Sequence, residues 1–268
     1  MAAAPFFREA GSGPGVVCVH SNASSSGQWR GLMDLLAPRF RVLAADSYGA
    51  GKTPAWSGAA GPSLGDEVAL LEPVFQQAGD PFALVGHSYG GAVALVATVK
   101  HPKRVRALAL YEPTLFALVE RASPSPNDVD GIRNAVVASV KALEAGDAAG
   151  AARCFIDFWM APGSFDRMPE RVQAATAESV RSIQAWKDAL FDEPTPLEAF
   201  AALDVPVLLM VGSKSPLSSR AVAHKLAAAL PRAELTEVEG LGHMGPVTHP
   251  DAVNPLIARF LRNSGTEP

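Results

Sequence analysis

Residues 82–91 read FALVGHSYGG, in which four apolar residues lead directly into a Gly-x-Ser-x-Gly segment. The Ala- and Val-rich stretch that follows, up to Lys100, predicts a helix. A serine on a sharp turn between a buried strand and a helix needs small neighbours, and Gly86 and Gly90 supply them. The helix N-terminus would also direct free amides toward charge that forms near the serine. This context favours a nucleophilic role for Ser88; the alternative is a glycine-rich turn that binds a phosphate.

The rest of the chain alternates short apolar runs with helical patterns. Six runs have the apolar character of strands that helices cover on both faces; they are Val16–Val19, Arg41–Ala45, Phe82–Val85, Val105–Leu110, Val207–Val211 and Glu234–Val238. The helical patterns between them are Trp29–Leu36, a segment that Ser63 opens as its cap, Gly91–Lys100 and Arg220–Leu230. This alternation predicts an α/β fold with a doubly wound, mostly parallel sheet.

The alternation stops between about Pro113 and Leu203, where several helical patterns occur without a good strand. These patterns are Asp130–Ala145, Asp147–Trp159, Pro169–Ala174 and Val180–Leu190. We therefore expect an all-helical lid (residues 113–203) that is inserted between two strands of the sheet. Residues 1–112 and 204–268 would form the core on which this lid sits.

The expected lid carries large aromatic side chains. Phe155, Trp159 and Trp186 are candidates for a substrate pocket, because such pockets are lined mainly by apolar and aromatic groups. The alternative is that the same side chains pack the lid onto the core, and both roles stay open. A mostly apolar lid favours an uncharged substrate.

The nucleophile turn, the predicted sheet and the lid together resemble the α/β-hydrolase superfamily, in particular its small lid-bearing esterase, haloperoxidase-like and dehalogenase-like members. The resemblance extends from about Gly15 to Leu261, and its motifs are specific for the fold but much less so for the substrate. It implies a catalytic triad of nucleophile, acid and histidine beside an oxyanion hole. The implied mechanism needs no cofactor, and no cluster of Cys, His and carboxylates has the spacing of metal ligands.

The base of the triad is expected at His243. A serine hydroxyl needs a base within hydrogen-bond reach to become nucleophilic at neutral pH. His243 lies in the segment GLGHM (residues 240–244), after the last predicted strand and before a terminal helix, where the family places its catalytic histidine. The alternative is a structural loop histidine. The other five histidines are expected to organise loops, pack, cap helices or face solvent: His20, His87, His101, His224 and His249.

The acid of the triad is missing from its usual position. In most relatives an aspartate follows the strand that corresponds to Val207–Val211. Here that loop reads GSKSP (residues 212–216), and the family position falls on Ser215, which cannot carry a negative charge.

Glu112 is the best replacement for that acid. It lies at the carboxyl end of the preceding predicted strand, and some members of the superfamily carry the acid there. The order Ser88, Glu112, His243 keeps the family order of nucleophile, acid and base. The alternatives are a structural role for Glu112 with Ser215 acting through water, and Glu239 as the acid.

Two backbone amides are expected to form the oxyanion hole, because negative charge develops on the carbonyl oxygen during attack. One belongs to Tyr89, directly after the nucleophile. The other lies in the loop VHSNA (residues 19–23), where Ser21 replaces the family's glycine and Asn22 occupies the position of the donor. The alternative is that Asn22 caps a helix that starts near residues 24–28.

The predicted function is a serine hydrolase that cleaves small to medium carboxylic esters through an acyl-enzyme. Three other reactions on the same triad stay open: hydrolysis of a carbon–carbon bond, opening of a lactone, and haloperoxidase- or perhydrolase-like chemistry. A halide-releasing reaction is disfavoured, because dehalogenase relatives use aspartate where this chain has Ser88. From a different class, the fold could serve as a non-catalytic receptor for a small ligand.

The composition argues against other partners. The formal net charge is −4 and no run of residues is rich in Lys or Arg, so we expect no nucleic-acid partner. No apolar run reaches the roughly 18 residues of a membrane span, and residues 1–10 lack the order of a secretory signal, so we expect a cytoplasmic protein. Cys18 and Cys154 lie in apolar surroundings and are expected to be buried free thiols. Both a monomer and a homodimer stay open.

Overall fold

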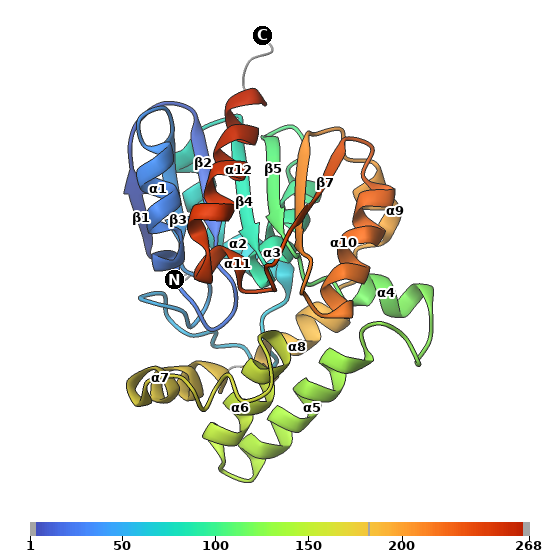
Figure 1. The fold of residues 1–268 in the computed structure, drawn as a ribbon. Coiled ribbons are helices and arrows are strands. Elements are labelled where there is room, and N and C mark those ends of the chain that lie inside the picture. Colours follow the sequence, from blue (N-terminus) through green and yellow to red (C-terminus); the bar gives the residue numbers. More distant parts are fainter. Residues whose placement is uncertain (1–3, 182, 265–268) are drawn as a thin grey trace.

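The computed structural model describes residues 4–181 and 183–264, and a seven-stranded sheet lies at its centre (Figure 1). The strands are β1 (Phe7–Ala10), β2 (Gly15–Val19), β3 (Arg41–Ala45), β4 (Phe82–His87), β5 (Val105–Tyr111), β6 (Val207–Gly212) and β7 (Ala233–Val238). Their order across the sheet is β1-β3-β2-β4-β5-β6-β7. Only β1 pairs antiparallel, with β3, among the described strands. The predicted α/β fold with a mostly parallel sheet is confirmed.

The central predicted strands form because both of their faces are apolar, whereas β7, at the edge of the sheet, is only partly buried. In β2, Val16 and Cys18 contact one layer of helices, whereas Val17 and Val19 contact the other, and all four are completely buried. Burial also raises the pKa of the Cys18 thiol. The second thiol differs from expectation, since Cys154 is free but only half-buried.

Strand β1 is an addition to the predicted set. Its four residues include Arg8 and Glu9, so it lacks the continuous apolar run of a strand that is covered on both faces. It lies at the edge of the sheet, where short strands with charged side chains are common.

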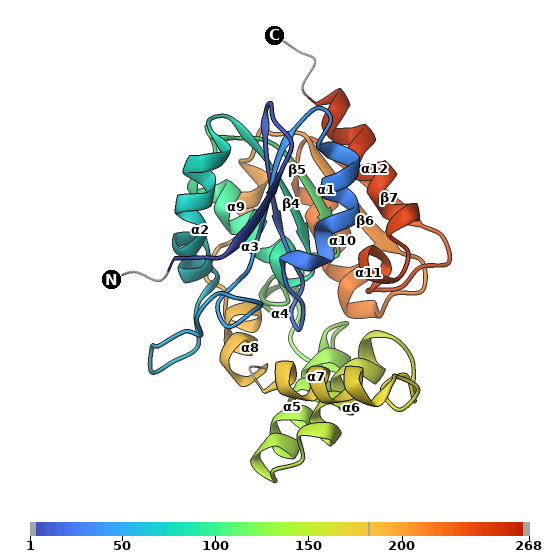
Figure 2. The same ribbon diagram turned by 90° about the vertical axis from the view of Figure 1, so that its left-hand side faces the viewer.

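Helices cover both faces of the sheet (Figure 2). One layer contains α1 (Arg30–Leu36) and α12 (Pro250–Asn263), preceded by η1 (Ser26–Trp29) and α11 (Gly245–Thr248). The other layer contains α2 (Leu64–Ala78), α3 (Tyr89–Lys100) and α10 (Leu217–Ala229). Helix α2 begins as predicted, because the Ser63 hydroxyl accepts from the amide of Asp66 at 3.1 Å and the Asp66 carboxylate accepts from the amide of Ser63 at 2.9 Å.

The order of the strands decides where a site can form. Strands β2 and β4 are neighbours in the sheet. After β2 the chain crosses to β3 on one side, whereas after β4 it crosses to β5 on the opposite side. In open α/β sheets, ligands bind outside the carboxyl ends of the strands at such a switch point. The loops that follow β2 and β4 therefore border the expected binding crevice, and the second of these loops carries Ser88.

The segment between β5 and β6 contains helices joined by loops, and its described residues include no strand. Its helices are α4 (Ala117–Ala122), α5 (Asp130–Glu144), α6 (Ala148–Trp159), α7 (Glu170–Val180), α8 (Ile183–Phe191) and α9 (Leu197–Ala201). Both views place α5 to α8 together beyond one end of the sheet (Figures 1 and 2). The predicted helix at Pro169–Ala174 is longer than expected and continues to Val180.

The division into a core (residues 1–112 and 204–268) and a lid (residues 113–203) stays a prediction. Residues 1–3, 182 and 265–268 of these ranges lie outside the described residues. Among the described helices, none is both long and apolar enough to cross a membrane. The cytoplasmic location also stays a prediction, and both a monomer and a homodimer stay open.

The turn after β4 packs directly against the end of β2. A Cβ atom on Gly90 would lie 2.3 Å from the carbonyl oxygen of Val19, and one on Gly86 would lie 2.5 Å from the carbonyl oxygen of Gly90. Both contacts involve backbone atoms, which cannot move aside as the end of a flexible side chain can. These two positions therefore require glycine for space, as the motif predicted.

Replacing Gly90 by alanine should lower the free energy of unfolding by about 2 kcal/mol or more, because the new methyl group overlaps backbone atoms. Urea denaturation measures this change. Gly31→Ala in α1 is the matched control, since its Cβ would meet only a side-chain nitrogen of Asn254, at 3.4 Å. Alanine at that helical position should raise stability by up to about 1 kcal/mol. A Gly90→Ala variant as stable as the wild type would contradict the close packing.

Candidate active site

Ser88 occupies the turn between β4 and α3. Its backbone is in a strained conformation, with φ 55° and ψ −119°. The surrounding backbone holds this turn, since the amide of Ser88 donates to the carbonyl of Tyr111 at 2.9 Å and its own carbonyl accepts from the amides of Ala92 and Thr114. The hydroxyl therefore stands at the carboxyl end of the sheet, although the residue is only 6% exposed.

The ring of His243 lies between Ser88 and Glu112. Nε2 is 2.9 Å from the hydroxyl oxygen of Ser88, and Nδ1 is 2.6 Å from Oε2 of Glu112. A proton on Nδ1 is donated to the carboxylate, which leaves the lone pair of Nε2 to accept the serine proton. The structure thus joins, in one hydrogen-bonded line, three residues from the ends of β4, β5 and the loop after β7.

The carboxylate of Glu112 is completely buried and accepts hydrogen bonds at both oxygens. Oε2 faces His243, while Oε1 accepts from the amide of Gly212 at 2.8 Å and from the hydroxyl of Ser215. Burial by itself would raise the pKa of Glu112. The hydrogen bond and charge of His243, together with the hydrogen bonds from Ser215 and Gly212, outweigh burial and hold the pKa below its usual value. Glu112 is therefore a charged partner for the imidazole.

Two serines of the neighbouring loop and helix support this pair. Ser215, at the position where most relatives have the acid, binds the carboxylate of Glu112 directly. Ser219, in the first turn of α10, places its hydroxyl oxygen 3.3 Å from Nδ1 of His243. The contact of Ser219 was not predicted, because it depends on how α10 packs and no local motif signals it. Glu239 is not among the groups that contact His243 in the described residues.

Backbone strain is concentrated at this site. In the described part of the chain, the non-glycine residues with positive φ are Ala23, Ser88 and Glu112. They follow β2, β4 and β5 at the same edge of the sheet. Strained residues cluster at functional sites because the surrounding structure must hold them there. This pattern supports the choice of site independently of the sequence motifs.

The two amides expected to form the oxyanion hole belong to the loop after β2 and to the first residue of α3. The backbone amides of Asn22 and Tyr89 have no hydrogen-bond partner within the described residues, so both are available to a ligand. The loop that carries Asn22 is held by Gln28, whose side-chain oxygen accepts from the amide and the hydroxyl of Ser21 at 3.1 and 3.0 Å. The cap of the following helix η1 is Ser25, so the alternative role of Asn22 as this cap is wrong.

The other buried histidines connect the loops of the site. Nε2 of His87 donates to the carbonyl of His243 at 2.8 Å, and its Nδ1 accepts from Gln28 at 3.1 Å. His20 donates from Nδ1 to the carbonyl of Ser21 at 2.7 Å and accepts from the amide of Ser47 at 3.1 Å. Burial lowers the pKa of both His20 and His87, so these rings stay neutral. Across the described residues, no cluster of three or more His, Cys, Asp or Glu could hold a metal ion.

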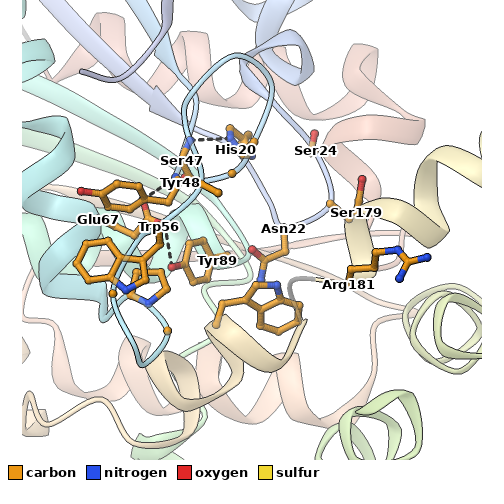
Figure 3. Close-up of a pocket in the computed structure, with 18 of the residues that line it drawn as sticks. His20, Asn22, Ser24, Ser47, Tyr48, Trp56, Glu67, Tyr89, Ser179 and Arg181 are labelled. Atoms are coloured by element: carbon orange, nitrogen blue, oxygen red, sulfur yellow. Dashed lines mark hydrogen bonds between the residues drawn. The ribbon is translucent and has the colours of Figure 1, made fainter. Parts of the chain in front are cut away.

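A cavity of about 600 Å³ adjoins the oxyanion loop (Figure 3). Its wall includes Asn22, Tyr89 and residues 47–51 of the loop after β3. Of the three lid residues expected to line a pocket, Trp186 does so.

Phe155 and Trp159 are not part of that wall. Phe155 packs its ring against Trp159 and Trp186, at 6.0 and 5.5 Å between ring centroids. Trp159 stacks on the imidazole of His243, with centroids 3.8 Å apart and planes inclined by 23°. Phe155 and Trp159 lie on α6, which packs beside His243 and not along the cavity. Trp159 therefore covers one face of the His243 imidazole.

A buried carboxylate in the cavity wall was missed by the sequence analysis. Glu67, in the first turn of α2, is 2% exposed and accepts from the hydroxyl of Tyr89 at 3.1 Å and the amide of Tyr48 at 3.3 Å. Burial raises its pKa to about 7, against the opposing effect of these hydrogen bonds. A signal existed, because Glu67 interrupts the apolar face that Leu64 and Val68 form on α2.

The raised pKa of Glu67 makes a testable contribution to stability. The native protein holds this proton up to about pH 7, whereas the unfolded chain releases it near pH 4.5. The contribution is therefore full below pH 4.5 and is lost as the pH rises through 7. Relative to wild type, Glu67→Gln should gain up to about 3 kcal/mol of unfolding free energy between pH 4.5 and 8. Urea denaturation at both pH values tests this, and a difference independent of pH would contradict it.

Comparisons with known proteins show the same fold. A family model described as alpha/beta hydrolase fold matches residues 14–250. A pimeloyl-[acyl-carrier protein] methyl ester esterase from Yersinia enterocolitica is 26% identical over 256 residues, which are 94% of this chain and 94% of that protein. The crystal structure of an alpha/beta hydrolase from Sphaerobacter thermophilus has a TM-score of 0.70 and 25% identity over 96% of both chains. A 2-hydroxy-6-oxo-6-phenylhexa-2,4-dienoate hydrolase from a Rhodococcus strain has a TM-score of 0.77 and 23% identity, over 98% of this chain and 96% of that one.

Proposed function

The chain belongs to the alpha/beta hydrolase fold family and is a hydrolase, and we propose that it cleaves small to medium carboxylic esters with Ser88 as its nucleophile. The observation that carries the proposal is the hydrogen-bonded line from Ser88 through His243 to Glu112. The methyl ester esterase that aligns with 94% of the chain supports an ester as the substrate class.

The first half of the reaction forms an acyl-enzyme. The oxygen of Ser88 attacks the ester carbonyl carbon while Nε2 of His243 takes the serine proton. Glu112 stabilises the imidazolium that results, and the amides of Asn22 and Tyr89 bind the negative oxygen of the tetrahedral intermediate. The bond to the alcohol oxygen then breaks, and His243 returns its proton to that oxygen, which releases the alcohol.

The second half regenerates the enzyme. A water molecule gives a proton to His243 as its oxygen attacks the acyl carbon. The bond between this carbon and the oxygen of Ser88 breaks, and Ser88 recovers a proton from His243. The products are a carboxylic acid and an alcohol, so water is the only reactant besides the ester.

The other reactions considered for the same triad are less well supported. Hydrolysis of a carbon–carbon bond, lactone opening and perhydrolase-like chemistry would use the same nucleophile and base. The Rhodococcus hydrolase is 23% identical and supports a common fold alone. A non-catalytic receptor would have no need of a charged, buried carboxylate that is hydrogen-bonded to the imidazole beside Ser88.

Turnover of 4-nitrophenyl acetate and butyrate should depend on Ser88. Because the nucleophile is lost, Ser88→Ala should lower kcat by at least about 10⁴-fold, and a fluorophosphonate should label the wild type at Ser88 alone. Ser264→Ala, at the end of α12, is the matched control and should keep both activity and labelling. A folded wild-type protein that binds these esters without sustained turnover would favour the receptor.

Glu112→Gln should lower kcat roughly a thousandfold or more, because the imidazole loses its charged partner. Adding Ser215→Asp should restore at least about tenfold of this loss, since the hydroxyl of Ser215 already contacts the carboxylate of Glu112. Ser215→Ala alone should cost about tenfold at most, which distinguishes Glu112 from an acid role of Ser215 through water. Near-normal kcat for Glu112→Gln would reject the assignment of the acid.

A further inference from the structure

The cavity beside the oxyanion loop contains a buried carboxyl group without a positive partner. Within the described residues, no Lys, Arg or His forms an ion pair with Glu67. Its two oxygens accept one hydrogen bond each, from Tyr89 and from the amide of Tyr48, so further lone pairs stay available. Burial and the nearby Asp66 both oppose its ionisation. A cation in the cavity would relieve this cost.

The rest of the same wall is rich in aromatic side chains. Tyr48 and Trp56 meet edge to face with ring centroids 4.9 Å apart, and Tyr89 and Trp186 lie 6.5 Å apart. Figure 3 shows Tyr48, Trp56 and Tyr89 gathered around Glu67. Aromatic faces attract organic cations, most strongly where water is excluded. A carboxylate among such rings is the lining that suits an alkylammonium group.

The cavity has a second, different side. Ser179 and Arg181 lie away from Glu67, across the cavity (Figure 3). Arg181 pairs with Glu178 at 2.8 Å, at the exposed end of α7. The charge of Arg181 is therefore paired away from Glu67, and no other Lys or Arg is among the described residues that line the cavity.

Tyr89 connects the end of the cavity that contains Glu67 to the expected oxyanion hole. Its backbone amide is one of the two donors of the expected oxyanion hole, whereas its hydroxyl donates to Glu67. Because one residue carries both groups, a substrate whose carbonyl oxygen is bound at that amide and whose chain extends into the cavity would approach Glu67. Asn22, the second donor, lines the same cavity.

We propose that the cavity selects esters that carry an alkylammonium group, which Glu67 holds among the rings of Tyr48, Trp56 and Trp186. This inference rests on the proposed ester hydrolysis and names its substrate class. It replaces the uncharged substrate expected from the apolar lid, because the cavity wall is formed mainly by the loops after β2 and β3 and also includes Glu67 of α2 and the charged lid residues Arg181 and Asp188.

The test uses pairs of esters that differ only in one nitrogen for one carbon. On the alcohol side the pair is choline butanoate and 3,3-dimethylbutyl butanoate. On the acyl side it is methyl 4-(trimethylammonio)butanoate and methyl 5,5-dimethylhexanoate. The trimethylammonium group cannot donate a hydrogen bond through N–H, so the ratio of kcat/KM within a pair measures charge. At pH 8, where the carboxyl group of Glu67 is mostly ionised, wild type should prefer the cation by at least about tenfold in one pair.

Glu67→Gln should reduce this preference about tenfold, because the amide keeps the shape and an acceptor but loses the charge. The matched control is Asp188→Asn, which removes an exposed negative charge from the rim of the same cavity and should change the ratio less than about threefold. Thermal unfolding of both variants checks that they are folded. An equal effect of the two variants would overturn the inference.

A third alcohol-side ester, 3-hydroxy-3-methylbutyl butanoate, separates charge from hydrogen bonding. If Glu67→Gln lowers kcat/KM for this ester and not for the cation, the cavity recognises a hydroxyl and the inference is wrong. A ratio near one in both pairs, with the neutral esters hydrolysed, would also overturn it.

Calorimetry of Ser88→Ala distinguishes the inference from the proposed function. This variant should bind choline butanoate at least about tenfold more tightly than 3,3-dimethylbutyl butanoate, and Ser88→Ala combined with Glu67→Gln should lose the difference. Selective binding without any hydrolysis by the wild type would reject the ester hydrolase and keep the cation site. Hydrolysis without selective binding would do the reverse.

Discussion

A buried hydrogen bond between Nδ1 of His243 and a carboxylate oxygen of Glu112 is the interaction on which the arrangement of this site depends. A carboxylate without contact with water is costly to keep charged, so the surrounding structure must offer it donors. It does so from three segments: the loop after β7 supplies the imidazole, the end of β6 supplies the amide of Gly212, and the next loop supplies Ser215. The carboxyl edge of the sheet is organised around one side chain from β5.

Much of this site could be predicted from the sequence, because its parts lie at the ends of apolar strands. Parallel strands end at the same edge of a sheet, so Ser88, Glu112 and the loop with His243 could be expected to meet before any coordinates were known. The contact of Ser219 could not be predicted, since it depends on the packing of α10. Strand β1 was not predicted for a different reason, because an edge strand of four residues with two charged side chains has no apolar pattern.

The lid and the cavity show where composition stops being informative. Aromatic residues in a helical insertion indicate buried surface, but they do not tell which surface is covered. Trp186 borders the cavity, whereas Trp159 rests on the imidazole. Glu67, a single carboxyl group on the otherwise apolar face of α2, adds a buried acid to a wall that other polar residues also line. The loop with Asn22 and the loop with His243 are joined by hydrogen bonds through Gln28 and His87. Because burial lowers the pKa of His87, this link introduces no charge.

The indole of Trp159 has a mechanical effect on the imidazole against which it lies. A ring stacked at 3.8 Å cannot turn about its Cβ–Cγ bond without driving its edge into its neighbour, and the hydrogen bonds at both nitrogens oppose the same rotation. The two nitrogens therefore keep separate partners, with Nε2 facing Ser88 and Nδ1 facing Glu112. Helix α6, which lies outside the sheet, thus helps to fix which edge of the His243 imidazole faces Ser88.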